Sequence, residues 1–126
     1  MAVGAVETKV AASPADVWAV AGKFDGVGEL FPGIDSFRME GDDRIIGMFG
    51  LEIREHMISR DDETMTLEYS VIDGVPLESH TARISVTADG DASLVTWSYD
   101  VEPESMAPIF GQTYTGALEA LAAHFA

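Results

Sequence analysis

The chain has 126 residues and a mass of 13.5 kDa, which is the size of one ordinary domain and excludes a second folded domain. The sequence contains 0 cysteines, so disulfides and thiolate metal sites are impossible. Lys and Arg number 7 against 22 Asp and Glu, and the formal net charge of -15 repels phosphate backbones and anionic membranes. We therefore expect no nucleic-acid partner and no membrane partner.

Targeting signals and cofactor motifs are also missing from the sequence. No stretch reaches the roughly 18 apolar residues of a membrane span, and the first ten residues lack the pattern of a signal peptide, so we expect a cytoplasmic protein. The glycines at 26–28 do not complete a dinucleotide-binding loop, and the three histidines fall on different elements. We expect neither an organic cofactor nor a bound metal.

The first part of the chain predicts a strand followed by short helices. Residues 2–12 place Val6, Thr8 and Val10 on one face at a period of two. Ser13 and Pro14 then provide a capping hydroxyl and a proline in the first helical turn, which is typical of a helix start. Residues 25–33 are rich in glycine and predict a second short helix, broken by Pro32 and Gly33.

The rest of the chain predicts a meander of strands and a closing helix. Five turn signals, each acidic or containing glycine, separate six predicted strands. They lie at 40–43, 49–50, 60–63, 73–76 and 88–91. Apolar residues then recur with helical spacing through residues 104–125. The predicted fold class is α+β, with the order β-αα-β6-α, in which a curved antiparallel sheet wraps around the long C-terminal helix. A bent sheet cannot close everywhere around a helix, so we expect an internal cavity in this single domain of residues 1–126.

Several segments also resemble a known family: SPADVW at 13–18, FPGI at 31–34, LEYSVIDGVPL at 67–77 and LVTWSY at 94–99, together with the terminal helix. They resemble the polyketide cyclase/dehydrase group of the START-like, helix-grip superfamily (SRPBCC) from about residue 3 to residue 125. The resemblance implies a largely apolar pocket for a hydrophobic or aromatic small molecule. Many members carry Trp-His-Pro where this chain has Leu30-Phe31-Pro32, so a histidine is missing from the expected pocket mouth.

Hairpin registers that keep apolar residues on one face predict which polar side chains point inward. They place Tyr69 opposite both His80 and Glu55, and they place Arg44 opposite Glu55. Glu55, Tyr69 and His80 would then form one inward row able to perform general acid–base catalysis, such as removal of a proton next to a carbonyl. The alternative is structural: Glu55 pairs with Arg44, while Tyr69 and His80 satisfy each other.

The sequence leaves three hypotheses of function open. The first is a cyclase- or dehydratase-like lyase that acts on a hydrophobic, aromatic or polyketide-like molecule through Glu55, Tyr69 and His80. The second is a carrier or sensor whose helices at 14–31 gate the pocket, and the third is a pocket filled by its own side chains. The chain is expected to be a monomer or homodimer. The predicted ligand-binding residues are Phe31, Phe37, Met39, Met57, Trp97, Tyr99, Phe110 and Tyr114.

Overall fold

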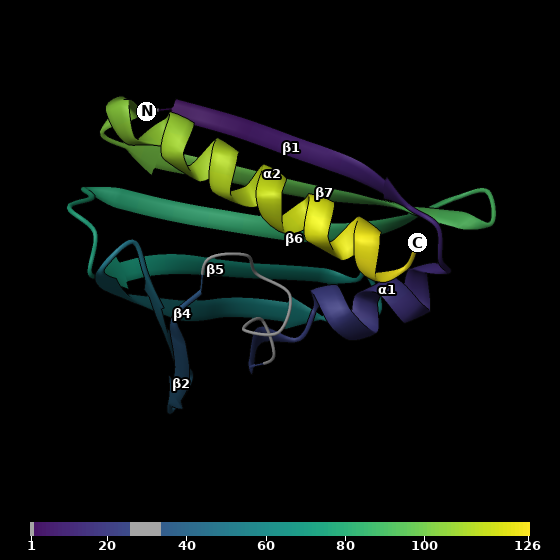
Figure 1. Cartoon of the computed structure of the whole chain (residues 1–126), viewed down its shortest axis with the longest axis horizontal. Helices are drawn as coiled ribbons and strands as arrows, with labels where there is room; N and C mark the ends of the chain where they lie inside the picture. Colours follow the sequence, from purple (N-terminus) through teal and green to yellow (C-terminus); the bar gives the residue numbers. More distant parts are fainter. Residues whose placement is uncertain (1, 26–33) are drawn as a thin grey trace.

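The computed structural model describes residues 2–25 and 34–126, which form an antiparallel sheet with a long helix across one face (Figure 1). In chain order the elements are β1 (Ala2–Val10), α1 (Pro14–Ala21), β2 (Ser36–Glu40), β3 (Asp43–Met48), β4 (Leu51–Asp61), β5 (Thr66–Asp73), β6 (Ser79–Asp89), β7 (Ala92–Glu102), a 3-10 turn (Glu104–Met106) and α2 (Ala107–His124). The 7-stranded sheet has the order β1-β7-β6-β5-β4-β3-β2. The predicted fold class is confirmed. The second short helix predicted at 25–33 and the candidate Phe31 lie outside the described residues, apart from Asp25.

The first helix begins where the sequence predicts. The Ser13 side chain accepts a hydrogen bond from the Asp16 amide at 3.3 Å. Pro14 occupies the first turn, where backbone amides have no partner within the helix, so the proline costs no hydrogen bond. Helix α1 buries Val17 and Trp18 against the sheet. Trp18 also donates from Nε1 to Asp62 Oδ1 at 2.9 Å, so α1 is linked to the turn after β4.

Two hairpin registers are as predicted, and two differ by two residues. Arg44 lies opposite Glu55, and Ala82 lies opposite Tyr99, as expected. Tyr69, however, pairs with Ala82 rather than His80, and on its other side with Met57 rather than Glu55. Irregularities in β4 and a longer connection between β5 and β6 cause these shifts. A slip of two residues keeps every side chain on its predicted face, so all three members of the predicted row still point inward.

The connection between β5 and β6 is shaped by a close approach to β4. Gly74 has a φ of +94°, and a Cβ at this position would lie 2.0 Å from the carbonyl oxygen of Glu52. Only glycine fits both conditions without a backbone shift. The chain then turns back through a hydrogen bond from the Leu77 amide to the Val75 carbonyl before β6 begins.

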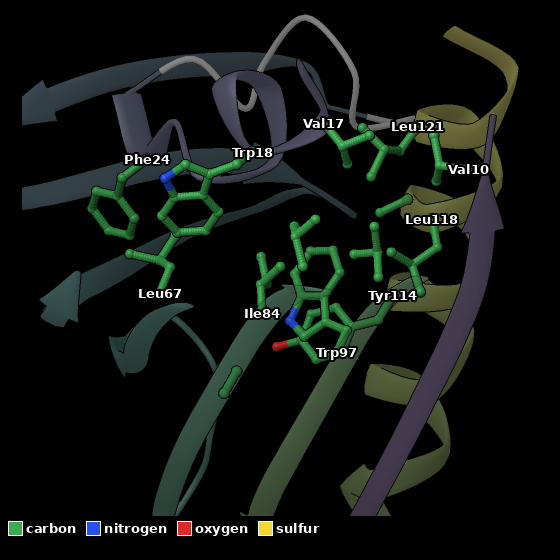
Figure 2. Close-up of a cluster of buried hydrophobic side chains, with 14 of the residues drawn as sticks. Val10, Val17, Trp18, Phe24, Leu67, Ile84, Trp97, Tyr114, Leu118 and Leu121 are labelled. Carbon is green, nitrogen blue, oxygen red and sulfur yellow. The ribbon is translucent and has the colours of Figure 1, made fainter. Parts of the chain in front are cut away.

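Helix α2 packs unevenly along its length. It rests mainly on β1 and, to a smaller extent, on β7. Its second half buries Tyr114, Ala117, Leu118 and Leu121, whereas no residue before Tyr114 is buried. Figure 2 shows Leu118 and Leu121 in one apolar cluster with Val10 and with Val17 of α1. The hydrophobic core thus fills the end of the helix–sheet interface nearest α1, and the other end stays open.

Candidate functional site

A cavity of about 480 Å³ occupies the open end of the interface, between the first half of α2 and the inner face of β3, β4 and β5. Most of its wall is aliphatic or aromatic, and Glu55 is the charged side chain among its described lining residues. The described lining consists of Ile46, Met48, Phe49, Leu51, Ile53, Glu55, Val71, Val75, Met106, Ile109, Phe110, Gln112, Thr113 and Tyr114. This size and composition are typical of small-molecule sites.

The outer rim of the cavity carries apolar side chains that face water. Phe49 in the turn between β3 and β4 is 68% exposed, Leu51 at the start of β4 is 43% exposed, and Ile109 on α2 is 49% exposed. Each of them also lines the cavity. The rim therefore offers an apolar approach on a strongly acidic protein.

A buried ion pair lies behind the cavity wall. Arg44 Nε donates to Glu55 Oε1 at 2.6 Å, with side chains that are 2% and 9% exposed. The guanidinium also donates to the Phe24 carbonyl at 3.2 Å and lies over the rings of Phe24 and Tyr69, at 4.1 and 4.8 Å from their centroids. These contacts compensate the desolvated positive charge. The structural alternative for Glu55 is therefore present, yet Glu55 still lines the cavity and its Oε2 has no hydrogen-bond partner among the described residues.

A second polar cluster joins the sheet to α2. Trp97 Nε1 donates to the Tyr69 hydroxyl at 3.1 Å, and His80 Nε2 lies 3.0 Å from the Tyr114 hydroxyl. We call Tyr69, His80, Trp97 and Tyr114 the tyrosine network. Tyr69 and His80 therefore do not satisfy each other directly, because Tyr69 is bonded to Trp97 and His80 is bonded to Tyr114.

Burial sets the protonation states of this network. It lowers the pKa of His80 from 6.5 to about 4, so the imidazole is neutral at neutral pH. Burial also raises the pKa values of Tyr69 and Tyr114 well above 10, so both phenols keep their protons. At neutral pH His80 therefore takes part in this network as an uncharged hydrogen-bonding group.

The predicted site residues divide into three groups. Glu55, Phe110 and Tyr114 line the cavity, while Tyr69, His80 and Trp97 lie directly behind that wall in the tyrosine network. The Tyr114 ring is stacked on Trp97 with centroids 4.2 Å apart, so Trp97 faces a protein ring there. Both side chains are labelled in Figure 2. The other described candidates, Phe37, Met39, Met57 and Tyr99, do not belong to the described lining.

Tyr99 illustrates why an inward aromatic residue need not reach a ligand. A Cβ built on Gly4 of β1 would lie 2.4 Å from the Tyr99 hydroxyl, and one built on Gly111 of α2 would lie 2.8 Å from it. The tyrosine thus fills the space between β1 and α2 that these glycines leave. No pattern in the sequence predicts such a pairing of distant glycines with one ring.

Part of the cavity lining was not predicted from the sequence. Ile53 on β4 shares a face with Glu55 at a spacing of two residues, and this spacing would have identified it. Val75 and Met106 have no such signal, because they lie in connections whose path depends on the assembled fold.

No group of three or more His, Cys, Asp or Glu side chains is placed to hold a metal ion in residues 2–25 and 34–126. In the same part of the chain, no helix is long and apolar enough to cross a membrane.

Solved structures share this architecture over nearly the full chain. The protein XoxI from Bacillus cereus is 26% identical, with a TM-score of 0.91 over 99% of this chain and 96% of that one. A START superfamily protein from Mycobacterium smegmatis is 17% identical, with a TM-score of 0.79 over 98% and 97% of the two chains. A norcoclaurine synthase variant from Thalictrum flavum, solved with a transition-state analogue, is 23% identical, with a TM-score of 0.76 over 98% and 93%.

No curated protein matches the chain. The model of the family described as polyketide cyclase / dehydrase and lipid transport matches residues 1–126.

Proposed function

Because the chain belongs to the polyketide cyclase / dehydrase and lipid transport family, we propose that it binds a hydrophobic, aromatic or polyketide-like small molecule between the sheet and α2. The observation that carries this proposal is the cavity of about 480 Å³, which is walled by apolar side chains and contains one charged group among its described lining residues. Small-molecule sites commonly measure about 300–1,000 Å³ and combine such walls with few polar groups.

The apolar rim supports the same proposal. Phe49, Leu51 and Ile109 remain in water although each could be replaced by a polar residue at little structural cost. Exposed apolar side chains around a cavity mouth allow a hydrophobic molecule to leave water in steps. Their position fits an entrance to the cavity.

A panel of compounds tests ligand binding. The melting temperature of the purified chain is measured in the presence of aromatic, polyketide, sterol and fatty-acid compounds. A ligand that binds the folded chain raises this temperature, because at 100 times its Kd it adds about 2.7 kcal/mol to the free energy of unfolding. We expect a concentration-dependent rise with at least one aromatic or polyketide compound. A Phe110→Trp variant, which narrows the cavity, should reduce that rise. A panel without any shift would contradict the proposal.

Catalysis on the bound molecule is a second candidate, supported by one feature of Glu55. Its Oε2 has no partner among the described residues, while Arg44 holds Oε1 in place. A fixed carboxylate at a largely apolar cavity can accept a proton next to a ligand carbonyl and return it to a leaving hydroxyl, which is the chemistry of a dehydration. The tyrosine network would orient the ligand oxygen. Without this step, the chain is a carrier or sensor.

Recovery of the ligand separates the two candidates. A ligand found in the first panel is incubated with the parent chain and with Glu55→Gln, and both mixtures are analysed by mass spectrometry. Conversion by the parent alone supports catalysis by Glu55. A ligand that both proteins bind and leave unchanged supports the carrier or sensor, and equal conversion by both would remove Glu55 from the reaction.

A further inference from the structure

The direction of the hydrogen bonds in the tyrosine network can be determined from His80. Its Nδ1 lies 3.0 Å from the Val71 amide nitrogen, and a backbone amide can only donate. Nδ1 is therefore the acceptor, and a neutral imidazole carries its single proton on Nε2. His80 Nε2 consequently donates to the Tyr114 hydroxyl, 3.0 Å away.

Each tyrosine hydroxyl of the network accepts a hydrogen bond through its oxygen. Trp97 Nε1 donates to the Tyr69 hydroxyl, and His80 Nε2 donates to the Tyr114 hydroxyl, so neither bond uses a phenol proton. In residues 2–25 and 34–126, neither phenol proton has an acceptor at hydrogen-bonding distance.

Burial decides which of the two phenol protons a ligand can reach. Tyr69 is 0% exposed and is not part of the described cavity wall, so its proton is closed off from a molecule in the cavity. Tyr114 lines the cavity and accepts from His80 through its oxygen, so its own proton is available to the cavity.

Glu55 offers the complementary group from the opposite wall. It projects from β4, whereas Tyr114 projects from α2, and both line the cavity. Arg44 neutralises the Glu55 charge through Oε1, and Oε2 remains as a hydrogen-bond acceptor. These two walls thus present a donor and an acceptor with little net charge, while the other polar residues of the described lining are Gln112, which is exposed, and Thr113, whose hydroxyl is bonded within α2.

We propose that the Tyr114 hydroxyl and Glu55 Oε2 determine ligand specificity, by selecting uncharged apolar molecules that carry a carbonyl-type acceptor for Tyr114 and a hydroxyl-type donor for Glu55. This inference rests on the proposed small-molecule binding and specifies its ligand class. Hydrocarbons leave both groups unpaired, and a fatty-acid carboxylate would bring a second negative charge to Glu55. Such ligands bind more weakly than an uncharged molecule with both groups.

The predicted hydrogen bond from the Tyr114 hydroxyl to a ligand is tested with two probes of nearly the same shape. 2-Acetonaphthone carries a carbonyl oxygen, and 2-isopropenylnaphthalene carries a methylene group in its place. We expect the parent to bind the ketone about threefold to tenfold more tightly, as one additional hydrogen bond allows, and Tyr114→Phe to lose this preference. The carbonyl stretch of the bound ketone should also lie at a lower frequency in the parent than in Tyr114→Phe.

Thr113→Val is the matched control for this substitution. Thr113 also lines the cavity and is the neighbouring residue on α2, but its hydroxyl already donates to the Ile109 carbonyl at 2.8 Å. Removal of this hydroxyl should leave the ketone preference unchanged. A loss of preference in both variants would overturn the role assigned to the Tyr114 proton.

The predicted hydrogen bond from a ligand hydroxyl to Glu55 Oε2 is tested with 2-naphthol, which can donate, and 2-methoxynaphthalene, which cannot. In Glu55→Gln the amide oxygen is expected to accept from Arg44, so the amide NH2 faces the cavity and a donor replaces the acceptor. The parent should favour the naphthol, and the variant should lose or reverse that preference. Binding of all four probes with no preference in the parent would overturn this inference and leave the proposed cavity site intact. Binding of none would overturn both.

Discussion

The two halves of the interface between α2 and the sheet share one apolar stripe of the helix but have different roles. In the half nearest α1, Leu118 and Leu121 are buried in a continuous core. In the other half, Phe110 of the same stripe lines the cavity, and Ile109 beside it is 49% exposed. Hydrophobic periodicity therefore identifies the face of the helix that turns toward the sheet, but it does not reveal where the sheet comes close enough to fill the space.

The different surroundings of the helix explain this contrast. Helix α1 adds Val17 and Trp18 to the closed half, as Figure 2 shows, and thereby fills the space between the sheet and α2. The cavity lies between the start of α2 and strands β3 to β5, whereas α2 itself rests on β1 and β7. The tyrosine network marks the boundary between the filled and the open half.

The largest expected effect is in the closed half. Leu118→Ala should lower the free energy of unfolding by about 2–5 kcal/mol, because it removes a buried side chain from a packed cluster that cannot fully relax. Urea denaturation followed by circular dichroism measures this change. A loss below about 1 kcal/mol would contradict the description of a closed, tightly packed half.

A smaller effect is expected at the boundary, where His80 makes the free energy of unfolding depend on pH. The unfolded chain binds a proton with the ordinary histidine pKa of 6.5, whereas folded His80 binds it only near pH 4. Its stabilising contribution is therefore complete above pH 6.5 and is lost as the pH falls toward 4. Between pH 7 and pH 5 the loss should reach about 2 kcal/mol.

His80→Gln is the control for this pH dependence. Glutamine can accept from the Val71 amide and donate to Tyr114, but it does not titrate. Urea denaturation of both proteins at pH 7, 6 and 5 isolates the histidine contribution, because their carboxylates are the same. Parallel curves for the two proteins would show that His80 is protonated at its ordinary pKa in the folded chain.

The sequence alone predicts the fold well because its signals are local. Ser13 and Pro14 mark the start of α1, and the turn signals separate the strands as observed. Inward faces are also predictable, since Glu55, Tyr69 and His80 are all buried. A register error of two residues does not change the face of a side chain, which is why this prediction survived incorrect pairing.

Contacts between these inward side chains could not be predicted, because they depend on the distance between elements. No local signal indicates that Tyr114 is the hydrogen-bond partner of His80, since it comes from α2 and not from a neighbouring strand. Likewise, Trp97 and Tyr114 were both expected to contact a ligand, and they are stacked on each other. The Arg44–Glu55 pair is the exception, because a tight hairpin fixes its register.

The smallest effect on stability is expected in the open half. Ile109→Ala should change the free energy of unfolding by less than about 0.5 kcal/mol, since half of the side chain is already in water and no packed cluster surrounds it. The same variant should weaken binding of the neutral fluorophore N-phenyl-1-naphthylamine, because Ile109 lines the cavity. Titration of the fluorophore into the parent, Ile109→Ala and the remote surface variant Val3→Ala, which removes a side chain that is 75% exposed, measures this effect. If Ile109→Ala weakens binding of the fluorophore and leaves the free energy of unfolding nearly unchanged, the open half of the interface serves a ligand. A large loss of stability in Ile109→Ala would instead mean that both halves are core.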